Sequence, residues 1–213
     1  MPGTTRQIAR DLTFRFPDDQ AMALIGRNGA GKSSLLNMLA GTMRPDRGRV
    51  LRQGRISWPV GFQGSFHPDL TGLENARFAA RLYGMDTTQV TNFIEDFAEL
   101  GRQFYAPVRM YSAGMKSRLA FALSMSMPFD TYLIDEVTSV GDGAFREKSE
   151  ALLQERLAAA SAVVVSHSME LLSRLCTSGA VLENGRLFFY QRVERAIEHH
   201  GHLMRGQLPP WLA

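Results

Sequence analysis

The chain has little that would tie it to an oxidising compartment or to the interior of a membrane. Its one cysteine, Cys176, has no partner for an internal disulfide and is expected to be a small buried residue. No apolar run approaches the roughly 18 residues that a spanning helix needs, and the first residues, MPGTTRQIARDL, lack the apolar segment of a secretory signal. We therefore expect a reducing compartment and a chain that neither crosses a membrane nor is exported through a cleaved signal.

The chain also lacks a strong charge of either sign. It has 24 lysines and arginines against 21 aspartates and glutamates, an excess that looks small and dispersed along the chain. This composition gives no reason to expect nucleic acid as a partner. With 213 residues and 45% hydrophobic content, the chain can instead bury one sizeable core, which favours a single domain.

Apolar segments and helical patterns alternate along the chain. Patterned apolar segments predict strands at residues 12–16, 21–25, 131–135 and 162–166. Strand pairs are predicted at residues 47–57, with a turn at Gln53-Gly54, and at residues 179–191, with a turn at Asn184-Gly185. Helical spacing is expected for Leu35, Leu36, Leu39 and Met43, for three segments between residues 71 and 127, and for residues 147–161. This order predicts an α/β fold in which helices cover a parallel sheet.

A glycine-rich loop joins the strand at residues 21–25 to the helix after it. Residues 26–33, GRNGAGKS, fit the pattern G-x-x-x-x-G-K-[ST], whose backbone N–H groups at a helix N-terminus wrap the phosphates of a nucleotide. Lys32 would neutralise phosphate charge and Ser33 would bind Mg²⁺, and a chance match in such a chain is on the order of one per cent. The residues assigned to ATP are Gly26, Arg27, Asn28, Gly29, Ala30, Gly31, Lys32, Ser33 and Ser34.

Two carboxylates and a histidine follow later strands. Asp135 and Glu136 end one strand and His167 follows another, at the sheet edge where parallel strands place their ligands. Asp135 would hold Mg²⁺ through water, Glu136 would act as general base on an attacking water, and His167 would contact the γ-phosphate. Each of these residues alone would be an ordinary polar residue at a solvated strand end. Their occurrence in the same chain as the phosphate loop favours a functional role. Together they predict ATP hydrolysis.

A serine-glycine motif stands at the start of a predicted helix shortly before the Asp-Glu pair. Tyr111-Ser112-Ala113-Gly114-Met115 resembles the signature motif of ATP-binding-cassette (ABC) ATPases, although alone it would predict only a helix N-cap at Ser112. The resemblance implies that Ser112, Ala113, Gly114 and Met115 close over ATP held by a second subunit, in a head-to-tail homodimer. It also implies a Mg²⁺ ligand at Gln63, and Ser139-Val140-Gly141-Asp142 resembles the family's D-loop, with Gly141 in place of the commoner Leu.

The resemblance covers residues from about 8 to 198 and implies a phosphate-loop NTPase core with a parallel sheet, an antiparallel β subdomain and an inserted α-helical subdomain. Within one domain spanning residues 1–213, we expect residues 1–70 and 128–198 to form the core, 71–127 the helical subdomain and 199–213 a tail. The family begins with an additional strand and an aromatic residue that stacks on adenine, and Met1 falls after that point. This predicts either a weak, base-tolerant nucleotide site or an authentic start upstream of Met1. Phe14 and Phe16 are expected to be core residues.

Four longer segments resemble the ATP-binding subunits of bacterial exporters of capsular polysaccharide and O-antigen: ISWPVGFQGSFHPDLTGLENARFAARLYG, YSAGMKSRLAFALSMSM, YLIDEVTSVGD and VVVSHSMELL. This implies a peripheral subunit on the cytoplasmic face of the bacterial inner membrane. It would energise a separate polytopic permease that handles capsular polysaccharide.

Other functions stay open at this point. An O-antigen or teichoic-acid type exporter would use the same cassette. A soluble ABC ATPase acting on ribosomes or DNA usually carries two cassettes or long coiled-coil insertions, and a small-molecule kinase shares only the phosphate loop. A histidine tract at residues 198–202 is a weak metal-binding candidate.

Overall fold

The structure, a computed structural model, describes residues 7–62, 64, 66–136 and 143–212. Within these ranges one six-stranded sheet forms, in the order β2-β3-β4-β1-β5-β6. The strands are β1 (Ala21–Ile25), β2 (Ile56–Val60), β3 (Thr131–Asp135), β4 (Ser161–Val165), β5 (Ser178–Glu183) and β6 (Arg186–Tyr190). All neighbours pair in parallel except β5 and β6, which form the hairpin predicted at Asn184-Gly185. The predicted α/β fold class is confirmed.

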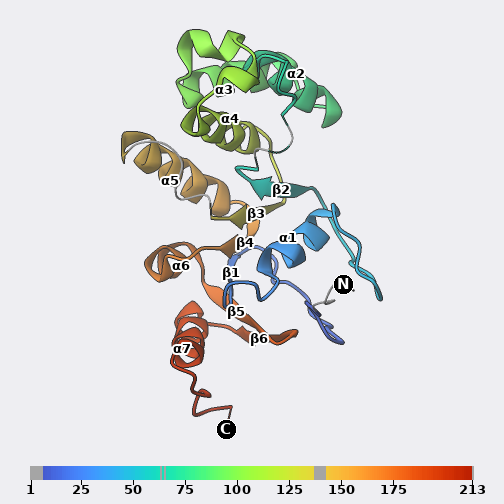
Figure 1. Cartoon of the computed structure of the whole chain (residues 1–213), viewed down its shortest axis with the longest axis vertical. Helices are drawn as coiled ribbons and strands as arrows, with labels where there is room; N and C mark the ends of the chain where they lie inside the picture. The colour runs from blue at the N-terminus through green and yellow to red at the C-terminus, as the bar shows by residue number, and fades with distance from the viewer. Residues whose placement is uncertain (1–6, 63, 65, 137–142, 213) are drawn as a thin grey trace, which may run out of the picture.

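Helices lie on both faces of the sheet and beyond one of its ends (Figure 1). They are α1 (Lys32–Ala40), α2 (Gly72–Leu82), α3 (Thr87–Ala98), the short 3₁₀ helices η2 (Gly101–Tyr105) and η3 (Val108–Met110), α4 (Ala113–Met125), α5 (Gly143–Leu157), α6 (Met169–Leu175) and α7 (Val193–Met204). Helix α1 covers one face, and α5, α6 and α7 lie on the other side of the sheet (Figure 1).

Strand β1 shows how the sequence builds these two layers. All five of its residues are buried, as expected for a central parallel strand. Successive side chains point to opposite faces, so Met22 and Leu24 pack in one cluster with Leu36 of α1. Ala23 belongs to the other cluster, which contains Phe145 of α5. The end of β1 is therefore fixed between two apolar layers.

Helices α2, α3 and α4 gather at the far end of the molecule, as the helical pattern of residues 71–127 predicts (Figure 1). Each begins at a side-chain cap, which satisfies a backbone N–H that the helix leaves unpaired. Thr71 and Glu74 form a reciprocal capping box at α2, Asp86 caps α3, and Ser112 caps α4. The signature residues thus lie at a well-defined helix start.

Lys148 fastens this helical part to the core. Its Nζ donates to Glu99 Oε1 at 2.6 Å and to the Phe97 carbonyl at 3.2 Å, at the C-terminal end of α3. The rings of Phe97 and Phe145 pack beside this contact with their centroids 5.5 Å apart. Helix α3 is therefore held against α5, the helix that follows β3.

Two strand predictions in the first third of the chain are wrong. Residues 12–16 alternate between exposed and partly buried but form no strand, because they pack on the core without pairing. Phe14 lies with its ring centroid 4.9 Å from Phe16 and 5.5 Å from Phe189. In the predicted pair at residues 47–57, only Ile56 and Ser57 are in a strand, β2, which pairs in parallel with β3.

The end of α1 explains why the pair at residues 47–57 does not form. Helix α1 ends at Ala40 with Gly41 in the left-handed conformation, so Met43 lies beyond the helix, contrary to prediction. Arg52 donates from Nε to the Leu39 carbonyl at 2.8 Å and from Nη2 to the Met38 carbonyl at 2.7 Å. The guanidinium thereby binds the last carbonyls of α1 and holds the segment against the helix instead of in a hairpin.

The histidine tract lies in α7, and His199 is fully buried. Its Nδ1 is 2.9 Å from Tyr190 Oη, which accepts a hydrogen bond from Trp211 Nε1 at 3.2 Å. Its Nε2 lies 3.9 Å from Glu183 Oε2 and has no hydrogen-bond partner among the described residues. Burial, and to a smaller extent the charge of His202, lowers the pKa of His199. Among the described residues no group of three His, Cys, Asp or Glu side chains could hold a metal ion.

We expect the protein to lose stability as the pH falls. The pKa of His199 is lowered in the folded state, so below the ordinary histidine pKa of about 6.5 the unfolded chain binds more protons than the folded chain. The free energy of unfolding, measured by urea denaturation between pH 7.5 and pH 5, should therefore decrease toward acid. His199→Gln should weaken this dependence, and the same change at the exposed His67 should not. Equal slopes for both variants would contradict the assignment.

Candidate active site

The phosphate loop connects the buried end of β1 to the first turn of α1. Gly29 (φ 77°) and Gly31 (φ 107°) adopt the left-handed backbone conformation that side chains disfavour. A Cβ at Gly26 would lie 2.6 Å from the Leu182 carbonyl oxygen, so the loop passes too close to β5 for a larger residue. The path of the loop therefore requires glycine at these positions.

Lys32 is the first residue of α1 and folds back over the loop. Its Nζ donates to the carbonyls of Gly26 at 2.7 Å and Arg27 at 3.3 Å. Partial burial lowers the pKa of Lys32, while the charges of Asp135 and Glu136 act in the opposite direction. A partly desolvated ammonium group at a helix N-terminus favours an anion such as phosphate.

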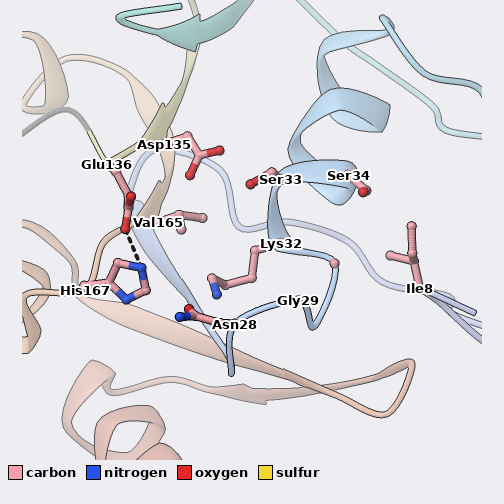
Figure 2. A pocket seen from close by; sticks show the side chains of 11 residues that line it. Ile8, Asn28, Gly29, Lys32, Ser33, Ser34, Asp135, Glu136, Val165 and His167 are labelled. Carbon is pink, nitrogen blue, oxygen red and sulfur yellow. Dashed lines mark ion pairs between the residues drawn. The ribbon is translucent and has the colours of Figure 1, made fainter. Parts of the chain in front are cut away.

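A cavity of about 570 Å³ lies between this loop and the ends of two further strands (Figure 2). Strands β3 and β4 are neighbours of each other, and β1 pairs with β4, so their carboxyl ends meet at one edge of the sheet. The residues that line the cavity are Ile8, Asn28, Gly29, Gly31, Lys32, Ser33, Ser34, Asp135, Glu136, Val165 and His167. The structure therefore brings the predicted loop, carboxylates and histidine together.

Glu136 and His167 lie next to each other on one side of the cavity and form an ion pair (Figure 2). Glu136 Oε1 lies 2.5 Å from His167 Nε2, and both side chains are at least half exposed. Glu136 has a left-handed backbone (φ 55°), and its N–H donates to the Val165 carbonyl at 3.0 Å. This turn after β3 directs the carboxylate into the cavity, where water can reach it.

The cavity also has oxygen donors suited to Mg²⁺. Ser33 supplies a hydroxyl and Asp135 a carboxylate, and both line the cavity opposite one another (Figure 2). Hard oxygen ligands of this kind, together with phosphate oxygens, are the usual environment of Mg²⁺. The third predicted ligand, Gln63, lies outside the described residues.

The signature residues lie elsewhere in the chain. Ser112 Oγ accepts a hydrogen bond from the Met115 N–H at 3.2 Å, and Ser112, Ala113 and Gly114 are exposed at the start of α4. None of the four signature residues lines the cavity. Asp142, predicted for the D-loop, lies outside the described residues. Within one chain, the structure thus keeps the signature apart from the phosphate loop.

Two lining residues were not predicted from the sequence. Ile8 lies against Gly31, where an added Cβ would collide with its side chain, and it precedes any regular pattern in the sequence. Val165 ends β4, and its place in an apolar strand gave the only signal. Gly26, Arg27 and Ala30, predicted to contact ATP, belong to the same loop but are not among the lining residues.

A family model described as "ABC transporter" matches residues 9–139. This match spans more than half of the chain, and the chain belongs to the ABC transporter family. The polysialic acid transport ATP-binding protein KpsT of Escherichia coli is 44% identical over 202 residues, covering 93% of this chain and 90% of KpsT. The capsule polysaccharide export ATP-binding protein CtrD of Neisseria meningitidis serogroup B is 41% identical over 198 residues, covering 93% of this chain and 92% of CtrD. The predicted resemblance to ABC ATP-binding subunits is confirmed.

Solved structures agree with the fold. The dimeric structure of a post-hydrolysis state of the ATP-binding cassette MJ0796, bound to ADP and Pi, superposes with a TM-score of 0.72 at 21% identity. The comparison covers 89% of this chain and 94% of that chain. In the part of the chain that the structure describes, no helix is both long and apolar enough to cross a membrane.

Proposed function

We propose that this chain hydrolyses ATP to energise the export of capsular polysaccharide through a separate membrane permease. The observation that carries the proposal is the cavity itself, where Lys32 and Ser33 of the phosphate loop face Asp135 and Glu136. The extent of the match to KpsT and CtrD, nearly end to end in both partners, supports the choice of cargo. A permease and a position on the cytoplasmic face of the inner membrane follow from that role.

The reaction attacks the γ-phosphorus of ATP with water and releases ADP and phosphate. Glu136 would accept a proton from the attacking water, and His167, 2.5 Å from its carboxylate, would orient that base and contact the γ-phosphate. Lys32 and the loop N–H groups would balance the charge on the phosphates. Ser33 and Asp135 would hold Mg²⁺, which when bound would supply charge neutralisation for the phosphates.

A second copy of the chain would complete the site. Ser112 and Gly114 are exposed at a helix N-terminus, which attracts anions, yet they do not line the cavity of their own chain. In a head-to-tail homodimer they would close over the ATP bound to the partner.

The permease would need a separate contact surface. Helix α2 offers two exposed apolar side chains four residues apart, Phe78 and Leu82, for this contact.

Genetic replacement in the native bacterium tests the proposal. Lys32→Ala should abolish surface capsular polysaccharide while polymer accumulates inside the cell, because the permease loses its source of energy. Surface and cell-internal polysaccharide would be extracted separately, with Arg186→Ala, an exposed change on β6, as the matched control. If O-antigen or teichoic acid were lost from the surface while the capsule stayed intact, that polymer would be the cargo in place of capsular polysaccharide. Unchanged surface polymers of all three kinds would contradict the exporter role.

A further inference from the structure

The positive charge of the chain is concentrated in one short segment and is not dispersed, as the composition suggested. Residues 44–55 contain five arginines and one aspartate, a net charge of +4, which exceeds the +3 of the whole chain. The remainder of the molecule is therefore close to neutral. This arginine segment, defined here as residues 43–55, connects α1 to β2 and runs as a long excursion at the edge of the molecule (Figure 1).

The arginine segment is anchored at both ends and near its middle. The Met43 N–H donates to the Asn37 carbonyl at 3.2 Å. Arg52 binds the last carbonyls of α1, and the N–H of Arg55 donates to Asp130 Oδ2 at 2.6 Å. Val50 packs in the apolar cluster beneath the sheet, together with Phe14 and Phe16. Side chains on either side of Val50 are therefore directed outward by a fixed backbone.

The outward side chains combine charge with apolar surface. Arg44, Arg47 and Arg49 are exposed, and none of the ion pairs in the described part of the chain includes them. Leu51 is 79% exposed, more than any other large apolar side chain among the described residues, and Met43 is 39% exposed. An exposed leucine side chain forms no favourable interaction with water and is stabilised when an apolar partner covers it.

We propose that the arginine segment binds anionic phospholipid headgroups, with Leu51 and Met43 inserted at the membrane interface. The negative surface potential of such a membrane attracts arginine side chains. Apolar side chains between them are removed from water when they enter the headgroup region, which stabilises the bound state. A single-stranded nucleic acid would instead favour aromatic side chains for base stacking, and residues 43–55 contain none. The proposal goes beyond ATP hydrolysis and depends on neither the permease nor the cargo.

Flotation of the purified full-length chain with lipid vesicles tests this proposal without nucleotide. The chain should bind vesicles of phosphatidylcholine with phosphatidylglycerol at low salt, bind phosphatidylcholine alone much more weakly, and dissociate as rising salt screens the charges. Replacing Arg44, Arg47 and Arg49 together by Gln should weaken partitioning about fivefold per arginine, on the order of a hundredfold in all. Leu51→Gln should weaken it further at constant charge.

A matched control separates the segment from net charge. Gln replacements at Arg77, Arg102 and Arg186, which are exposed at scattered positions, remove the same charge and should preserve binding. Circular dichroism and ATP hydrolysis verify that each variant is folded. No binding of the unaltered chain to anionic vesicles, equal losses for both triple variants, or binding to a soluble acidic polymer but not to vesicles would each overturn the proposal.

Discussion

Glu136→Gln is expected to lower steady-state ATP hydrolysis by roughly 10²–10⁴-fold, the contribution of a general base, while ATP binding persists. The amide keeps the shape of the carboxylate beside His167 but cannot accept a proton from water. Bound ATP would then remain uncleaved, and the closed dimer should accumulate. Phosphate release and size-exclusion chromatography with ATP and Mg²⁺ would measure the two effects.

The matched control is Glu147→Gln, the same chemical change at an exposed position of α5. It should hydrolyse ATP at the rate of the unaltered chain. Near-normal hydrolysis by Glu136→Gln would remove Glu136 from the role of base and direct attention to another carboxylate. A fall in hydrolysis together with loss of ATP binding would instead indicate a damaged site.

Mixing two inactive chains should restore ATP hydrolysis if the signature acts across a dimer. Lys32→Ala removes the phosphate-loop cation, and Ser112→Arg places a bulky cation at the exposed start of α4. Each homodimer then lacks an intact site, but a heterodimer contains one site with an intact loop from one chain and an intact signature from the other. Hydrolysis by the purified heterodimer, carrying distinct affinity tags on its two chains, measures the recovery.

The control for mixing is a chain that carries both substitutions. Paired with either single variant it leaves no composite site intact, so hydrolysis should stay at the background of the homodimers. Recovery in the first mixture but not in this one would support the head-to-tail arrangement. Absence of recovery in a verified heterodimer would count against the head-to-tail arrangement.

The parts of the site that the sequence predicts are short motifs at strand ends. The loop at residues 26–33 and the pair Asp135-Glu136 each occupy consecutive positions beside an apolar strand, so local pattern and fold place them together. Ile8 lines the same cavity but could not be predicted, because its position depends on how an irregular segment crosses the loop. The roles of the predicted residues remain predictions that the experiments above test.

The incorrect strand predictions have a common cause. Residues 12–16 alternate because one side packs on the core, and alternation does not reveal whether a neighbouring strand exists to pair with. At residues 47–57, contacts with residues distant in the sequence, such as Arg52 with the carbonyl end of α1 and Arg55 with Asp130, hold the segment in place. Net composition likewise concealed the arginine segment, because an excess counted over the whole chain does not show where it lies.

The position of β1 in the sheet also bears on how the protein is made. Its pairing partners are β4, where Ala21 aligns with Ala162, and β5, where Met22 aligns with Ser178. During synthesis, the apolar strand that supports the phosphate loop therefore emerges before β4 and β5 and stays without either neighbour until they follow. Contacts so distant in sequence close slowly and leave an unpaired edge exposed meanwhile. A nascent chain would thus acquire its nucleotide site only after β4 and β5 have been synthesised.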